Sequence, residues 1–445
     1  MNSVAVQTKR FLRLAPSNNS VSYSPVGSQP VIRFSIADTQ ALLLSKDVRL
    51  NFKLRTIRDG GTADVDLDDD FNIDPVVAGC GIMDQVIISS RRYGTTLEQI
   101  NNMARLDSSF YRSRYSSKQM ASNYYSETGA VGLGRYNAWE GSTQSSSTLA
   151  DLRLKAQRKK LVGTGGAVTD PSTEDLPAFS LPIHAGMFLS DDIDLSAVGG
   201  LELAIFLQKP EFLFFGTGTD APTSASNYEL YDVSLTCPLL YKSAQEIAQT
   251  PPENEVSFLN WTSLFSVLDS TSSSVAHRVF FSGLVSGIHN MLPTAQINAL
   301  SANCCALKDI GVERLTFLRD GQRNPLEKTA ITDRDSAVSI QASPSLSSEI
   351  LQDYLSAFLP PRDLKMSQVI PQNVKGVANR SGVFGLGCNY APDSGGVNVS
   401  GVLGLDVVSK LSDVATGATT EPYALFSFYL SRQSYLTSPA GIRSV

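Results

Sequence analysis

Few residue groups in this sequence have the types and spacing that catalysis requires. The three histidines, His184, His277 and His289, form neither an HExxH motif nor a Cys/His spacing suited to zinc. The segment 283–287 superficially suggests a nucleophile elbow, but that motif separates the serine from the second glycine, and here Ser286 precedes Gly287 directly. We therefore interpret the histidines as structural. The sequence predicts no catalytic, cofactor-binding or metal-binding residue, and a protein that is not an enzyme.

Two further segments could bind phosphate. The glycine-rich segment 163–166 lacks the Lys-Ser or Lys-Thr that follows in a phosphate-binding loop, so it is interpreted as a flexible turn. Five basic residues between Arg153 and Lys160 would line one face of a short helix over 149–161. That face could meet phosphate or an acidic neighbour, and a solvated helix face is the favoured reading.

An acidic loop at 64–74 invites comparison with a calcium site. Aspartates hold the first three ligand positions of an EF-hand-like loop. The sixth position, where glycine is needed, is Asp69, and the twelfth, where a bidentate glutamate belongs, is Pro75. We favour a solvated loop, and the sequence leaves open whether it binds a cation. Its acidic residues are Asp64, Asp66, Asp68, Asp69, Asp70 and Asp74.

Composition narrows the class of protein. At 445 residues the chain exceeds the size of one core, so two domains are expected. A net charge of −6 argues against a protein that coats nucleic acid, and no sequence-specific nucleic-acid partner is predicted. The sequence has no signal-peptide pattern and no apolar run long enough for a membrane span, so a soluble protein made in the cytosol is expected. Five cysteines are expected to be reduced and mostly buried: Cys80, Cys237, Cys304, Cys305 and Cys388.

The elements that would position any site are mainly strands. Residues 48–55 alternate for eight residues and predict a half-buried strand with Val48, Leu50, Phe52 and Leu54 inward. Further strands are predicted over 31–36, 82–90, 179–183, 201–207 and 228–235, and then over 258–268, 278–288, 313–319, 381–390, 401–408 and 423–430. This pattern predicts two all-β sandwich domains.

One helix is predicted in each half. Thr96 and Gln99 fit a capping box that would begin the first helix, whose apolar face is Leu97, Ile100, Met103, Leu106 and Phe110. The second is predicted from an N-cap at Ser345 to Phe358, before Pro360-Pro361. The strand before the first helix also has a similar segment in the second half, because residues 84–99 align with residues 313–328. This internal similarity makes a duplication worth testing.

Domain limits follow from the connecting segments. Residues 1–29 are polar and predict an extended N-terminal arm. A first domain is predicted over 30–245, with a long projecting loop at about 112–178. A connector within 242–252 leads to a second domain over 246–445.

The order of these pieces resembles the major capsid proteins of polinton-like viruses and virophages, within the double jelly-roll lineage of icosahedral DNA viruses. The resemblance is good from Gln29 to about Asn290 and looser beyond. The passages that carry it are 29–36 with 48–54, 82–110, 181–188 followed by the Gly-Gly-Leu-Glu-Leu region at 198–203, and 228–240.

The resemblance implies two consecutive jelly rolls, each with a flanking helix. It also implies homotrimers that form pseudo-hexameric capsomers and tile an icosahedral shell around a DNA genome. Penton and minor capsid or cement proteins would be further partners, and the protein would reside in the virion after synthesis in the host cytoplasm. In that setting the basic residues of the arm, Lys9, Arg10 and Arg13, are expected to face the interior.

A second class stays open from the residues alone: a carbohydrate-binding or glycan-hydrolysing β-sandwich protein. It would need exposed aromatic platforms and, for hydrolysis, a carboxylate pair across a cleft. Only two tryptophans, Trp139 and Trp261, are present.

Overall fold

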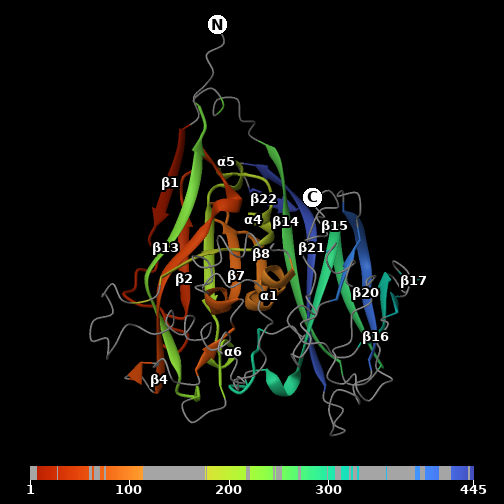
Figure 1. The fold of residues 1–445 in the computed structure, drawn as a ribbon. Coiled ribbons are helices and arrows are strands. Elements are labelled where there is room, and N and C mark those ends of the chain that lie inside the picture. Colours follow the sequence, from red (N-terminus) through yellow and green to blue (C-terminus); the bar gives the residue numbers. More distant parts are fainter. Residues whose placement is uncertain are drawn as a thin grey trace.

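In this computed structural model, the described residues form a seven-stranded sheet, a thirteen-stranded sheet and a two-stranded ribbon (Figure 1). The structure describes residues 8–27, 29–59, 63–64, 71–74, 77–113, 176, 178–216, 221–243, 246, 253–268, 272–297, 299–305, 312–319, 322–323, 328–329, 357, 386–390, 396–409, 422–438 and 441–444. None of the helices in these ranges is long and apolar enough to cross a membrane.

The elements follow one another in two groups, before and after residue 250. The first group comprises β1 (Thr8–Leu14), β2 (Val31–Ile36), β3 (Ala41–Leu43), η1 (Ser45–Asp47), β4 (Arg49–Asp59), β5 (Ala63–Asp64), β6 (Asn72–Ile73), η2 (Ala78–Ile82), β7 (Met83–Ser90), β8 (Thr96–Asn101), α1 (Met103–Ser113), β9 (Ala178–Pro182), α4 (Gly186–Leu189), β10 (Ile193–Asp194), α5 (Leu195–Val198), β11 (Leu201–Leu207), α6 (Pro210–Leu213), β12 (Phe214–Phe215) and β13 (Asn227–Tyr241). The second comprises β14 (Asn254–Leu268), β15 (Ser272–Pro293), η3 (Thr294–Gln296), β16 (Val312–Arg319), β17 (Gln322–Arg323), β18 (Lys328–Thr329), β19 (Leu386–Asn389), β20 (Val397–Ser409), β21 (Tyr423–Ser438) and β22 (Gly441–Ser444).

The first half is a sandwich. Its outer sheet has the order β10-β3-β13-β4-β5, with β1 on β13 and β9 on β4, and it packs against β2, β11, β7 and β8 of the large sheet. The strand predicted at 48–55 is β4, and Val48, Leu50, Phe52 and Leu54 are buried as predicted. On the facing strands the alternation predicted for 31–36 and 201–207 is also confirmed, and the buried side chains are Ile32, Phe34, Ile36, Leu201, Leu203, Ile205 and Leu207.

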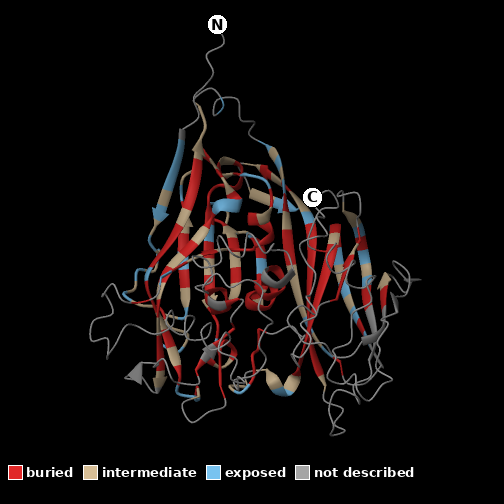
Figure 2. Cartoon of the chain, in the orientation of Figure 1, coloured by how far each residue is buried: buried red, intermediate tan, exposed pale blue. Residues whose placement is uncertain are grey.

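The second half continues the large sheet in the order β14-β21-β15-β20-β16. The first half of β21, residues 423–430, is buried on both faces, which agrees with its nearly unbroken apolar sequence. Phe426 and Phe428 face the core shared with the first half, whereas Leu425 and Tyr429 face a second core on the other side of the sheet. In Figure 2, β21 and the part of β15 that pairs with it are mostly buried.

The two halves meet at β8 and β14. These strands lie side by side in the centre of Figure 1 and pair in parallel at Thr262 and Gln99. Because this contact makes one sheet of both halves, the two sandwiches are joined through backbone as well as through side chains.

The predicted start of the first helix is wrong. Thr96–Asn101 is strand β8, and the helix begins only at Met103, after Asn102 with a φ of 56°. A Thr and a Gln three residues apart also occur together within strands, so the spacing is not specific to a helix start. Here β7 and β14 supply backbone partners on both edges of β8. Tertiary pairing therefore outweighs the local helix signal.

The segment expected to be an arm at 1–29 is docked over its described part. Strand β1 pairs with β13 from Thr8–Tyr241 to Leu14–Leu235, and Tyr23 is buried beside Leu230. The predicted second helix at 345–358 and most of the loop at 112–178 lie outside the described residues. The domain limits at 29, 245 and 246 stay predictions, with β13 ending at Tyr241 and β14 beginning at Asn254.

The sequence similarity between residues 84–99 and 313–328 has a structural counterpart. The alignment that sets Glu313 against Asp84 sets β16, residue for residue, against β7. Each of these strands turns back into an antiparallel partner, β8 after β7 and β17 with β18 after β16. This correspondence supports the duplication that the sequence suggests.

Candidate functional site: a buried polar seam between the halves

The polar groups of greatest interest lie where the two halves meet, and we call this cluster the seam. It is built from β8, α1, α4 and the segment just before α4 in the first half, and from β14, β15 and residues 302–305 in the second. Its side chains are Glu98, Arg105, Asp107, Ser108, Ser109, His184, Asn260, Trp261 and Asn290, all of them buried.

Glu98 joins three elements. Its Oε1 accepts hydrogen bonds from the backbone N–H of Gly186 (2.8 Å) and Trp261 (2.7 Å), and its Oε2 accepts one from Met187 (2.9 Å). Burial raises the pKa of Glu98 to about 7, although the three N–H donors oppose that shift. The carboxylate thus holds the start of α4 and β14 together on β8, and the side-chain amide of Asn260 adds a hydrogen bond to the carbonyl of Leu97.

A second contact pairs a carboxylate with a histidine. His184 Nδ1 lies 2.6 Å from Asp107 Oδ1, and both side chains are buried. Burial raises the pKa of Asp107, and the hydrogen bond with His184 opposes that shift. Phe110 stacks on His184, with centroids 4.8 Å apart, and meets the edge of Trp261 at 6.1 Å. The contact joins α1 to the segment that precedes α4.

Helix α1 reaches into the second half through its polar side chains. The guanidinium of fully buried Arg105 donates to the carbonyls of Cys304 (2.7 Å) and Met291 (3.3 Å). One turn further on, Ser109 and Asn290 share hydrogen bonds, and Asn290 Nδ2 also donates to the carbonyl of Arg105 (3.1 Å). Every described side chain of α1 from Met103 to Phe110 is buried. The helix is therefore buried between the two halves and is not an amphipathic surface helix.

One residue of the acidic loop also belongs here. Asp74 is buried, accepting from the N–H of Val77 (2.8 Å) and from the side-chain amide of Asn303 (2.7 Å), so it ties the first half to the second. Asp64 lies in β5, and Asp66, Asp68, Asp69 and Asp70 lie outside the described residues. Among the residues that the structure describes, no cluster of three or more potential metal ligands occurs. Whether the loop binds a cation stays open.

The other two histidines and Ser286 lie inside the second half. His289 is buried with Nδ1 2.9 Å from Ser427 Oγ, and burial lowers its pKa to about 3; burial also lowers the pKa of His277. Ser286 is buried in the middle of strand β15, which is not the strand–turn–helix context of a nucleophile elbow. All five cysteines are buried thiols, as predicted. The segments 153–160 and 163–166 lie outside the described residues.

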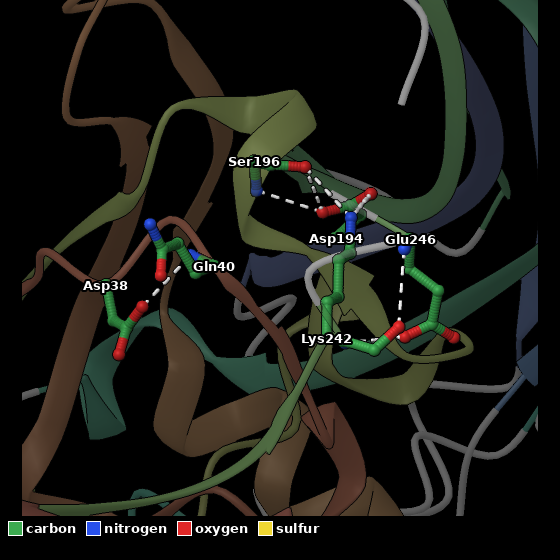
Figure 3. A network of polar contacts seen from close by, with 7 residues as sticks. Asp38, Gln40, Asp194, Ser196, Lys242 and Glu246 are labelled. Carbon is green, nitrogen blue, oxygen red and sulfur yellow. Dashed lines mark hydrogen bonds and ion pairs between the residues drawn. The ribbon is translucent and has the colours of Figure 1, made fainter. Parts of the chain in front are cut away.

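A smaller network holds the end of the first half (Figure 3). Lys242 Nζ lies 2.5 Å from Asp194 Oδ2 and 3.0 Å from Ser196 Oγ, and Asp194 also caps α5 through the N–H of Ser196. Burial raises the pKa of Asp194, but the hydrogen bonds from Lys242 and Ser196 outweigh it and the net shift is downward. Just beyond, Ser243 and Glu246 form a reciprocal capping box. The network fixes the chain where it leaves β13.

The sequence alone does not reveal the seam. Glu98 and Arg105 fall within the amphipathic helix that the sequence predicts, where charged residues indicate a solvated face. Their partners lie more than 80 residues away along the chain. Trp261, considered as an aromatic platform for glycans, is 1% exposed and packs in the seam. Trp139 lies outside the described residues.

Comparison with known proteins gives matches in structure alone. No family model matches the sequence, and no curated protein matches it. The fold is similar to the crystal structure of PBCV-1 VP54 fitted into a reconstruction of the virophage Sputnik (TM-score 0.54, 11% identity, covering 100% of this chain and 98% of the other). It is also similar to a chain of the PBCV-1 virus capsid (0.53, 9%, 100% and 98%) and to a chain of the Sputnik virophage structure (0.58, 10%, 100% and 90%). These matches show the double jelly-roll fold along the whole chain, and the resemblance noted from the sequence is confirmed at that level.

Proposed function

We propose that this chain is a viral major capsid protein. The observation that carries the proposal is the double jelly-roll fold, shared over the full length with a chain of the PBCV-1 virus capsid and a chain of the Sputnik virophage. The protein would act as a structural component of the virion and not as an enzyme. The seam supports this, because its polar groups are buried and form hydrogen bonds that join the two jelly rolls.

The proposed geometry of assembly starts from the two similar halves of one chain. Three chains arranged around a threefold axis present six similar sandwiches, which fill a hexagonal lattice site. We therefore propose that the chain forms homotrimers, that these are pseudo-hexameric capsomers, and that the capsomers tile an icosahedral shell around a DNA genome. Penton and minor capsid or cement proteins would complete the shell, with synthesis in the host cytoplasm before assembly.

The test is the mass and symmetry of the purified full-length protein, measured by light scattering and negative-stain imaging. We expect a stable trimer of the 47.9 kDa chain with a hexagonal outline, or closed shells. A monomer at every concentration tested, and in particular one that binds glycans, would contradict the proposal and favour the carbohydrate-binding alternative.

A further inference from the structure

Strand β1 has one edge that pairs with no other strand in the described part of the chain. All seven of its residues pair along the opposite edge with β13. In an antiparallel ladder every second residue turns its N–H and C=O away from the partner, so the outer edge of β1 presents a row of backbone donors and acceptors. Such a row is a template for one more strand.

The side chains next to this edge are apolar and basic. Phe11 is 69% exposed, although Leu12 and Leu14 on the opposite face of the strand pack against the core. The Lys9 ammonium lies 5.1 Å from the centre of the Phe11 ring, and Arg13 Nε donates to Ser234 Oγ at 2.8 Å. The outer face of β1 is therefore a stripe of cation, aromatic ring and cation, and the Arg10 guanidinium lies over the ring of Tyr241, 5.3 Å from its centre.

The positive charge of β1 favours an acidic partner. The strand carries Lys9, Arg10 and Arg13 and no acidic residue, in a chain whose net charge is −6. The only ion pair of the stripe within the described residues is between Lys9 and Asp47, which lie 3.9 Å apart and are both exposed. Pairing of β1 with the same strand of a second copy would set three cations against three cations, which is unfavourable.

Basic residues also occur on edge strands as a guard against aggregation. Protection against aggregation would explain the basic residues, but it would not explain a largely exposed phenylalanine at the centre of the strand. A strand that binds a partner would explain the basic residues and the phenylalanine.

We propose that the free edge of β1 binds an extended, acidic segment of another protein chain by strand addition. Backbone hydrogen bonds to β1 would supply most of the affinity, an apolar side chain of the segment would cover Phe11, and its carboxylates would lie beside Lys9, Arg10 and Arg13. The proposal does not depend on the capsid assignment, since it rests on the edge alone.

The test uses the full-length protein and three labelled heptapeptides in fluorescence anisotropy. The first is Val-Asp-Asp-Val-Asp-Asp-Val (the Asp-Val peptide), which sets Val opposite Phe11 and Asp opposite Lys9, Arg10 and Arg13 in either strand direction. The second has Lys in place of each Asp (the Lys-Val peptide), and the third is the Asp-Val peptide with every backbone nitrogen methylated (the N-methyl peptide). The third peptide keeps the side chains and the acidic charge but has no backbone N–H to donate, so it cannot add as a strand. We expect the Asp-Val peptide to bind and the other two to bind at least about tenfold more weakly.

Two variants separate strand addition from simple charge attraction. Phe11→Ser should weaken binding of the Asp-Val peptide, and the triple reversal Lys9→Glu, Arg10→Glu, Arg13→Glu should transfer the preference to the Lys-Val peptide. These side chains are exposed, so the variants are expected to melt at the wild-type temperature. Equal binding of the Asp-Val and N-methyl peptides, no binding of any peptide, or an unchanged preference in the triple variant would overturn the proposal. None of these outcomes bears on whether the chain trimerises.

Discussion

Glu98 offers the sharpest test of how the two jelly rolls are held together. The buried carboxylate accepts three backbone N–H groups, two from α4 and one from β14. Two effects act on its pKa in opposite directions. Burial disfavours the charged form and the hydrogen bonds favour it, and burial prevails, raising the pKa from 4.5 to about 7.

The sign of the pH dependence follows from this. Because the folded pKa lies above the unfolded one, the folded protein binds the proton more tightly. The stabilisation by protonated Glu98 is fully present below pH 4.5 and is lost as the pH rises to about 7. At about 1.4 kcal/mol per pKa unit, the shift corresponds to roughly 3 kcal/mol, of which about 2–3 kcal/mol should appear between pH 8 and pH 5.

The perturbation is Glu98→Gln, which keeps the shape of the side chain and removes its ionisable group. Its carbonyl oxygen can still accept from Gly186 and Trp261, but its amide meets the N–H of Met187, so we expect an overall loss of about 1–3 kcal/mol. The assay is chemical denaturation of wild type and variant at pH 5, 6, 7 and 8. The difference between them removes the contribution of all other carboxylates. Glu202→Gln, at an exposed position on β11, is the matched control.

We expect wild type to gain stability relative to Glu98→Gln as the pH falls from 8 to 5, and Glu202→Gln to follow wild type. A difference that is constant with pH would show that the carboxylate does not titrate with folding. A difference of opposite sign would refute the reasoning more directly, because it would mean that the three N–H donors outweigh burial.

Two other substitutions probe the seam by packing and by charge. In Gly186→Ala the new Cβ would lie 2.9 Å from the backbone of Asn260, so we expect a loss of about 1–3 kcal/mol in denaturation, against no loss in Gly441→Ala, where the surroundings are open. Arg105→Met removes the hydrogen bonds that the guanidinium donates to the carbonyls of Cys304 and Met291 and should lower stability by about 1–3 kcal/mol, with Arg105→Lys less affected. Wild-type stability in Arg105→Met would contradict this role.

The strands of the first sandwich could be predicted from sequence, because each buries one face. Alternation over 31–36, 48–55 and 201–207 identifies strands whose inner residues the structure confirms. Strand β8 could not be found in this way. Its buried residues are Leu97, Glu98 and Ile100, which do not alternate, because β8 lies between β7 and the second half. This irregular pattern matches a helix as well as a strand.

The seam was hidden for a related reason. Local patterns report the periodicity of one element, whereas each seam contact joins residues far apart in the chain. The carboxylate of Glu98 meets the N–H of Trp261 across 163 positions, and Arg105 meets the carbonyl of Cys304 across 199. A buried charge is indistinguishable in sequence from a solvated one until the partner that satisfies it is placed beside it.

A polar seam does something that an apolar one would not. Apolar surfaces slide with little penalty as long as area stays buried, whereas a buried hydrogen-bonded group tolerates only one arrangement. If β8 moved by one residue along β14, the N–H of Trp261 would lose the carboxylate of Glu98 and the pairing of Thr262 with Gln99 would be broken. Each lost partner leaves a buried polar group unsatisfied at about 1–3 kcal/mol. The seam therefore fixes one register between the jelly rolls, which is what the proposed assembly of identical copies would require.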